Sequence, residues 1–591
     1  MKVNRFLFIF FSFVLGCLIA WYFSNIITGL VFGLSFSGRS LKTQIILFLF
    51  YAFTASLLFL TIHIFVLKHK RVHSLIFLSF LAIACFLIIR VLYYQYQLIT
   101  FPYQLEYREG ATLLFTQGIL EGKNIFSLNQ APLYTNGYGV VYNLIVLPFA
   151  KLFGNTLCIH RIFTALFSYA SSGLVFYFIY KKNKNTLAGL FGGILFIISQ
   201  LYWVIPTARA DAAGLFLLLL SVFIPYSHSF SLRSLALSAI IGLISFYTKP
   251  YFLISIPIIA SYLFLFISKK KSLIFSGISI VIFLISVFIV NHFYETYFYN
   301  VVYVHTQIVS DQISHAIRQL YQFLLAYFPL IIAGILILFS EKTSCEDGVA
   351  SAFNEWKKSM QFNLLDFPEP LIKPKTDMVG YFLLCSTLAI FLALGRHIGN
   401  YMVYLFQLMT PFLIVLILGR LTPANPYRNL ILLFLVVNII SFRADYILNI
   451  DQSDWQKAEE YIKSSHKVLN SPPLTSILLK ENKPIIDSGQ TQYFFVPLDY
   501  ISNYFLPNSA AIKDIQNNYK QAVQSEIRNQ IYDYVMISTW DSPFTDFDVL
   551  NESYQLFDTL YLPMPQSNQS WLKPIENLEN HDWEISVWKP K

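Results

Sequence analysis

Two carboxylates stand three residues apart in a polar stretch that separates two apolar runs. Glu106 and Glu109 belong to the sequence Glu-Tyr-Arg-Glu-Gly at 106–110, inside the polar stretch 99–142. Acidic side chains are costly at a membrane edge, so by default they are interpreted as functional. A carboxylate held within hydrogen-bond reach of a hydroxyl can act as a general base. The alternative is that these are ordinary solvated charges on a loop, where carboxylates are common.

Cations and hydrogen-bonding side chains recur on further turns between apolar runs. Arginine binds phosphate through two hydrogen bonds and lysine binds it as a point charge, so these residues could receive a phosphorylated substrate. Three alternatives stay open: Asp211 could cap a helix, Lys249 could extend its amine to the interface, and the tyrosines could anchor in the headgroup region. The candidate binding residues are Arg108, Tyr134, Asn136, Tyr138, Arg209, Asp211, Lys249, Arg396, Asn400 and Tyr401.

The composition is that of a membrane protein. Hydrophobic residues make up 56% of the 591 residues and charged residues only 13%, whereas a soluble domain is nearer a quarter charged. The net charge is +9, but the basic residues cluster between apolar runs, which indicates membrane topology and not nucleic-acid binding. The five cysteines form no CxxC pair, so the sequence predicts neither a zinc site nor a disulfide framework.

The apolar runs predict an all-α polytopic membrane protein with about 13 transmembrane helices. Basic residues before a predicted span at 6–24 and after a predicted span at 44–67 place the N-terminus in the cytoplasm, and a third span at 75–97 then places Glu106 outside it. The run 140–153 is short and contains Pro148, so we expect a half-embedded helix on the outer face. The predicted segments are N-terminal helices at 1–97, a catalytic extracytoplasmic loop at 98–160, a transmembrane core at 161–449 and an extracytoplasmic domain at 450–591.

The last segment predicts a small α/β domain outside the cytoplasm. Helical spacing is expected at 455–463 and 510–528, and strands at 475–479, 484–487, 532–538 and 583–588. No phosphate-binding glycine motif occurs in this segment, and the sequence assigns it no catalysis.

The first polar stretch resembles the first luminal loop of the GT-C class of membrane glycosyltransferases, which includes protein O-mannosyltransferases and lipid A aminoarabinose transferases. The resemblance lies in Glu-Tyr-Arg-Glu-Gly at 106–110, Pro-Leu-Tyr at 132–134, Leu-Phe-Gly at 152–154, and Arg161. It implies a GT-C-like fold and an inverting single displacement on a polyprenyl-phosphate sugar. The resemblance also implies that no catalytic metal or other cofactor is needed.

The resemblance suggests roles for individual residues. This class usually carries an Asp-Glu pair in the loop, with the aspartate as base, whereas Arg108-Glu109 stands there in this chain. We therefore expect Glu106 to be the base, with Glu109 positioning or replacing it. Arg209-Ala-Asp211 resembles an Arg-Pro-Asp turn of the class, and Lys249 resembles a lysine that could meet the donor phosphate.

The expected function is transfer of a sugar from a polyprenyl-phosphate donor to a glycan, lipid or protein acceptor. The expected location is the plasma (inner) membrane, in contact with membrane lipids and not with nucleic acid. Two alternatives remain open. A flippase or transporter for lipid-linked saccharides would place ionisable residues at mid-membrane and show internal repeats. A non-catalytic envelope polysaccharide assembly protein would work mainly through its C-terminal domain.

Overall fold

The structure is a computed structural model that describes residues 70–201, 207–304, 327–343, 377–392, 408–425, 427–441, 451–496, 508–538, 545–563 and 583–591, with residues 320, 323–324, 361–362, 372–373 and 498. The chain divides into two compact units, Met1–Cys85 with Gln569–Glu576, and Phe86–Asn568 with Asn577–Lys591. Of the first unit only residues 70–85, the beginning of α3, are described. The predicted spans at 6–24 and 44–67 lie outside the described residues.

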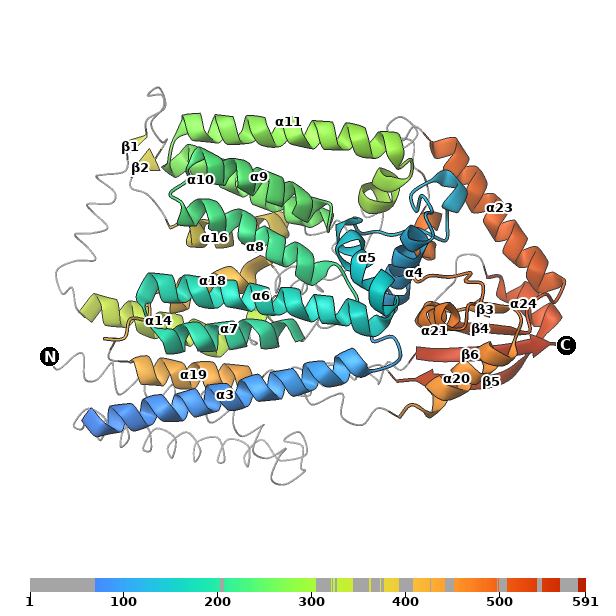
Figure 1. Cartoon of the computed structure of the whole chain (residues 1–591), viewed down its shortest axis with the longest axis horizontal. Helices are drawn as coiled ribbons and strands as arrows, with labels where there is room; N and C mark the ends of the chain where they lie inside the picture. The colour runs from blue at the N-terminus through green and yellow to red at the C-terminus, as the bar shows by residue number, and fades with distance from the viewer. Residues whose placement is uncertain are drawn as a thin grey trace, which may run out of the picture. The chain divides into compact units, whose positions relative to one another are not determined.

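The second unit is mostly helical and ends in a small mixed sheet (Figure 1). The helix α3 (Lys70–Thr100) begins in the first unit and continues into the second. The helices that follow it are α4 (Glu109–Leu120), η2 (Leu128–Gln130), α5 (Val141–Phe153), α6 (Leu157–Asn183), α7 (Thr186–Leu201), α8 (Asp211–Ser227), α9 (Leu232–Phe246), η3 (Pro250–Ile254), α10 (Ser255–Phe266), α11 (Lys269–Phe293), η4 (Tyr299–Tyr303), α14 (Phe328–Thr343), α16 (Met378–Leu392), α18 (Thr410–Leu418) and α19 (Arg428–Ser441). A two-residue hairpin, β1 (Gln361–Phe362) with β2 (Ile372–Lys373), lies between α14 and α16.

The apolar helices make this an integral membrane protein. Within the described residues, three helices are long and apolar enough to cross a bilayer: Phe77–Thr100 of α3, α6 and α11. The helix α11 carries many exposed apolar side chains, among them Leu284 and Phe288. A hydrophobic surface of this kind is stable only against lipid or another apolar partner. The predicted number of about 13 spans stays a prediction.

The central helices run alongside one another and bring several helix ends together. α6 packs against α7 and α8, α8 against α9, and α11 against α9 and α10 (Figure 1). α6 begins after Thr156, whose hydroxyl accepts a hydrogen bond from the Ile159 amide, and ends beyond Lys181 and Lys182. The beginning of α6, the beginning of α8 and the turn after α9 meet at one end of this group, which is where the candidate site lies.

The segment α5 has one apolar exposed face and one buried face. Leu144, Leu152 and Phe153 are exposed, whereas Tyr142 and Val146 are completely buried. A helix of 13 residues is about 20 Å long, which is shorter than the hydrocarbon core of about 30 Å. The half-embedded position predicted for 140–153 stays a prediction.

The C-terminal domain is built on a four-stranded mixed sheet in the order β3-β4-β6-β5. β3 is parallel to β4, and β6 is antiparallel to both β4 and β5. α23 packs on α24, and α20 on β5, around a core that contains Leu469, Tyr532 and Val535. The elements are α20 (Ser453–Ser464), β3 (Val468–Asn470), η6 (Pro472–Leu474), α21 (Thr475–Lys480), η7 (Thr491–Phe495), α23 (Ser509–Arg528), β4 (Tyr534–Ser538), α24 (Phe547–Ser553), β5 (Tyr554–Leu562) and β6 (Trp583–Pro590).

Two of the predicted strands in this domain are wrong. Residues 475–479 form most of the helix α21, because Pro472 and Pro473 begin a helical turn that continues into it. Residues 484–487 have no regular structure, since the Asn470 side chain, and not a neighbouring strand, accepts their backbone hydrogen bonds. The predicted helices 455–463 and 510–528 correspond to α20 and α23, and the predicted strands 532–538 and 583–588 to β4 and β6.

Candidate functional site

The loop before α4 folds back on itself and leaves Glu106 partly exposed. The Glu109 amide donates to the Glu106 carbonyl (3.1 Å), and the Arg108 amide donates to the Glu106 carboxylate (2.9 Å). The Arg108 guanidinium lies 3.4 Å from the same carboxylate. The Glu106 side chain retains 21% of its exposure, so of the two glutamates it is the one that a substrate can reach.

Glu109 lies in a closed, completely buried ion pair with Arg161. Two guanidinium nitrogens of Arg161 donate to the two carboxylate oxygens at 2.9 and 2.7 Å. The amides of Leu105 and Ala208 donate to the same oxygens, both at 2.6 Å. Arg161 also donates to three backbone carbonyls at the end of α3 and in the loop after it, including that of Tyr103. The pair therefore joins α3, α4, α6 and the turn before α8.

Tyr138 is the point at which three cations from separate segments meet. Its hydroxyl accepts hydrogen bonds from Arg108 (3.2 Å) and from Arg209 (3.1 Å). The Lys249 amine lies 4.5 Å from the centre of the Tyr138 ring. Arg108 and Lys249 are 141 positions apart in the sequence, yet both contribute to one electropositive group of side chains.

Asp211 holds two of these cations in place. It is completely buried, begins α8, and forms ion pairs with Arg209 (3.1 Å) and with Lys249. The Tyr251 hydroxyl also contacts the carboxylate at 3.4 Å. An acidic residue is favoured at the beginning of a helix, where the amides are unpaired. Asp211 therefore stands at the beginning of α8, as the helix-capping alternative expects, and its carboxylate holds two cations there.

The backbone brings Tyr138 to Lys249. The amides of Gly139 and Val141 donate to the carbonyls of Thr248 and Tyr247, each at 3.2 Å. A Cβ atom on Gly139 would lie 1.7 Å from the Tyr247 carbonyl oxygen, a distance at which no side chain fits. Glycine at 139 is what allows the two segments to approach this closely.

The cation cluster, defined as Arg108, Arg209 and Lys249 around Tyr138, carries surplus positive charge. Glu106 and Asp211 are the carboxylates in contact with it, so at ordinary charges one positive charge is left over. Burial opposes ionisation of the Tyr138 phenol, but the three cations outweigh it and lower its pKa below the ordinary value of 10.0. A buried site with this balance is suited to a single anionic group such as a phosphodiester.

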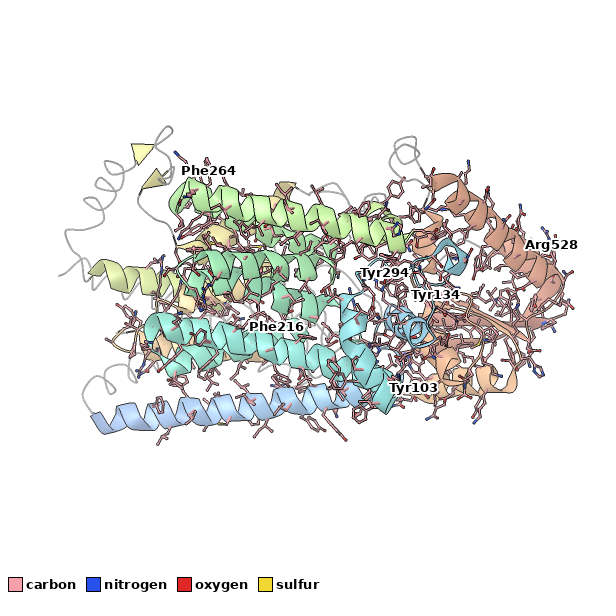
Figure 2. All side chains as sticks on the ribbon, turned by 45° about the horizontal axis from the view of Figure 1, so that its top comes forward. Tyr103, Tyr134, Phe216, Phe264, Tyr294 and Arg528 are labelled. Carbon is pink, nitrogen blue, oxygen red and sulfur yellow. The ribbon has the colours of Figure 1, made fainter. Side chains whose placement is uncertain are left out.

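The structure places the other predicted residues differently. Tyr134 packs beside Phe115 in an apolar cluster, and its hydroxyl accepts from Lys123 at 2.9 Å; Figure 2 labels it near the C-terminal domain. Asn136 accepts from the Tyr138 amide at 2.9 Å and so shapes the turn. The remaining predicted binding residues, Arg396, Asn400 and Tyr401, lie outside the described residues.

Sequence reasoning missed several residues that shape the site. Arg161 was named only among the residues of the resemblance and received no role, although an arginine near the beginning of the apolar helix α6 is a signal of a buried partner. Tyr107 accepts from Arg108 at 2.7 Å, and no spacing pattern pointed to it. Among the described residues, no three His, Cys, Asp or Glu side chains gather as a metal site would require.

The comparisons with known proteins give a fold likeness only. No known protein family matches the chain, and no curated protein sequence matches it. Two crystal structures of ArnT from Cupriavidus metallidurans, one in the apo state and one bound to undecaprenyl phosphate, are similar to it. Each is 10% identical to this chain, and the alignment covers 85% of this chain and 97% of ArnT with a TM-score of 0.46. At this similarity, function has to be argued from the side chains of the site.

Proposed function

We propose that this protein is a membrane glycosyltransferase that moves a sugar from a polyprenyl-phosphate donor to an acceptor hydroxyl at the extracytoplasmic face. The observation that carries the proposal is the cation cluster around Tyr138, with its one surplus positive charge beside a reachable carboxylate. The resemblance of the first loop to GT-C enzymes supports the same reaction. The acceptor is a glycan, a lipid or a protein.

Glu106 is the general base in this proposal. It takes the proton from the acceptor hydroxyl, and the acceptor oxygen then forms a bond to the anomeric carbon as the bond from that carbon to the phosphate oxygen breaks. The configuration at the anomeric carbon is inverted, and polyprenyl phosphate leaves with one additional negative charge. Arg108, Arg209 and Lys249 stabilise that charge where it develops, which is the usual source of the largest catalytic effect.

Glu109 and Asp211 act as positioning residues in the same proposal. Both carboxylates are completely buried and have their oxygens occupied by cations or amides. A carboxylate in that state has no oxygen to offer an acceptor hydroxyl. Glu109 fixes the loop that carries Glu106 and Arg108, and Asp211 fixes the side chains of Arg209 and Lys249.

The test is sugar transfer by the purified full-length chain in lipid nanodiscs, with a panel of polyprenyl-phosphate sugars and labelled acceptors. Glu106→Gln is expected to lower the turnover number by about 100-fold or more, the usual contribution of a general base. Binding of polyprenyl phosphate is expected to stay within a few-fold of the unchanged protein, because the cations remain. The matched control is Glu121→Gln, an exposed carboxylate directly after α4 that pairs with Lys123.

Full transfer by the Glu106→Gln variant would remove the proposed base. Movement of a lipid-linked saccharide across the membrane of liposomes without a transfer product would favour the transporter alternative.

The proposed orientation has a cytoplasmic N-terminus and the C-terminal domain outside. It is checked by replacing Lys457, an exposed residue of α20, with cysteine and labelling that cysteine with a membrane-impermeant reagent in intact cells.

A further inference from the structure

A segment of the C-terminal domain, residues 487–493, packs directly against the loop that carries Glu106 and Arg108. Gly489 has a φ of +91°, a left-handed conformation that favours glycine. A Cβ atom on Gly489 would lie 2.4 Å from the Tyr107 carbonyl oxygen. The close approach therefore depends on glycine in both its conformation and its size.

Gln490 forms the first contact between this segment and the site. Its side-chain oxygen accepts a hydrogen bond from the Gly137 amide at 2.5 Å, and the side chain is 1% exposed. Because the oxygen must face that amide, the orientation of the side chain is set, and its nitrogen is without a partner among the described residues. Gly137 directly precedes Tyr138, so this hydrogen bond holds the turn that presents the Tyr138 hydroxyl.

Tyr493 forms the second contact. Its hydroxyl lies 3.0 Å from the hydroxyl of Tyr107, which accepts a hydrogen bond from Arg108 at 2.7 Å. The Arg108 guanidinium also lies 4.6 Å from the centre of the Tyr107 ring. The orientation of Arg108 is thus supported from the C-terminal domain through one intervening tyrosine.

We propose that the C-terminal domain is part of the working site, with Gln490 and Tyr493 as positioning residues for Tyr138 and Arg108. The two contacts reach the two partners of a single hydrogen bond, the one between Arg108 and the Tyr138 hydroxyl. The residues that face the substrate then come from the helical part alone, while their geometry is set by both parts. The catalytic consequence rests on the proposed function, whereas the contacts of Gln490 with Gly137 and of Tyr493 with Tyr107, which we call the bracing contacts, do not.

Attachment of the domain depends on other contacts, so the bracing can be tested separately from it. Gln104 accepts from the Ser476 amide (2.8 Å) and donates to the Pro472 carbonyl (3.2 Å). Tyr103 stacks on Trp455, with ring centres 4.8 Å apart. These contacts are untouched by a change at 490 or 493, and the domain is expected to stay in place.

The experiment compares Gln490→Met and Tyr493→Phe with the unchanged full-length chain in nanodiscs. Gln521→Met is the matched control, because it makes the same chemical change at an exposed position of α23. Hydrogen exchange at Gly137 in Gln490→Met is expected to accelerate by about tenfold or more, since that amide loses its acceptor. Turnover in both variants is expected to fall by about tenfold with acceptor KM changed less than about twofold, the pattern of an interaction that acts in the transition state.

Gln490→Glu supplies the conservative rescue. The glutamate keeps an oxygen that can accept from the Gly137 amide, so hydrogen exchange there is expected to be slow again. If residue 490 only filled space, Gln490→Glu and Gln490→Met would not differ in this way. Unchanged Gly137 exchange in Gln490→Met would overturn the bracing, and so would turnover equal to that of Gln521→Met. If the unchanged protein transfers no sugar, the proposed function fails by itself. In that case the positioning role of Gln490 is decided by hydrogen exchange at Gly137 and by polyprenyl-phosphate binding, both measured in Gln490→Met.

Discussion

Glu106 and Glu109 have opposite environments although they are only three residues apart. Glu109 is enclosed by Arg161 and two amides, whereas Glu106 keeps part of its surface beside Arg108. One arginine in the helix α6 accounts for this division of roles. A carboxylate is stable in a dry interior only when it is paired and fully hydrogen-bonded, and Glu109 meets both conditions.

Removing the Tyr138 hydroxyl tests the centre of the cation cluster. Tyr138→Phe loses the acceptor shared by Arg108 and Arg209 but keeps the ring beneath Lys249. Hydrogen bonds to charged groups are worth about 1.5–3 kcal/mol each, so turnover is expected to fall by about tenfold or more. Steady-state transfer measures the effect, and Tyr177→Phe, an exposed tyrosine of α6, is the control. Equal turnover in the two variants would contradict the assigned role.

The buried ion pair predicts strong coupling between its two members. Arg161→Met leaves the Glu109 carboxylate buried without its cation and is expected to destabilise the folded protein by about 3–5 kcal/mol. Glu109→Gln leaves a buried guanidinium in the same way. The double variant is expected to be more stable than the sum of the two effects by about 0.5–3 kcal/mol. Thermal unfolding in detergent measures the stability of the two single variants and the double variant. Strict additivity of the two effects would show that the side chains of Arg161 and Glu109 are not coupled.

Residue types gave the candidates for this site but not their partners. Polar residues at the ends of apolar runs pointed to Arg108, Tyr138, Arg209, Asp211 and Lys249, because charges at membrane edges are rare. The pairing of Glu109 with Arg161 depends on the contact between α4 and α6, which no spacing rule contains. Tyr134 was selected by neighbourhood in the sequence, yet its ring belongs to an apolar cluster.

At the scale of elements, the junction between the Tyr138 turn and the turn after α9 is held by backbone atoms. Gly139→Ala would place a methyl group 1.7 Å from the Tyr247 carbonyl oxygen and must push the two turns apart. We expect loss of transfer activity and a lower unfolding temperature. The control is Gly173→Ala in α6, where a Cβ atom meets nothing within 4 Å. That change is expected to be neutral or to stabilise by about 0.5–1 kcal/mol.

In the C-terminal domain the helices α20 and α23 and the strands β4 and β6 were predictable, whereas β3, β5 and α21 were not. Helical periodicity identified α20 and α23, because the buried side chains recur on one face: Trp455, Ala458 and Ile462 in the first helix. The strands β3 and β5 were missed, the first because it has only three residues. Residues 475–479 have the apolar pattern of a strand, but α21 packs against α4, and the two prolines before it begin the helix.

At the scale of the whole molecule, the contact between the C-terminal domain and the helical part should respond to pH. Burial raises the pKa of Asp487 from its ordinary value of 3.8 to about 7, opposed in part by the Gly489 amide that donates to it at 2.9 Å. A raised folded-state pKa means that the stabilising contribution is complete below pH 3.8 and is lost as the pH rises through about 7. Tyr519 is a neighbouring group, and its pKa is raised first by burial and then by the negative charge of Asp487.

Asp487→Asn keeps an acceptor for the Gly489 amide but does not titrate. Its unfolding temperature is therefore expected to decline less than that of the unchanged chain between about pH 4 and pH 7, the interval between the ordinary and the raised pKa of Asp487. Asp548→Asn, at an exposed position of α24, is expected to follow the unchanged chain. Parallel curves for Asp487→Asn and the unchanged chain would contradict a buried acid that titrates near neutrality.

The contact between Gly137 and Gln490 also sets an order of events during biosynthesis. The two residues are 353 positions apart, whereas Glu109 and Arg161 are separated by only 52. At about 5–20 residues per second, roughly 20–70 s pass between the emergence of Gly137 from the ribosome and that of Gln490. A nascent chain halted before that point carries the carboxylates and cations without the braces that align them. The loop that carries Glu106 and Arg108 is thus synthesised early, but its contacts are completed only after Gln490 and Tyr493 have been made.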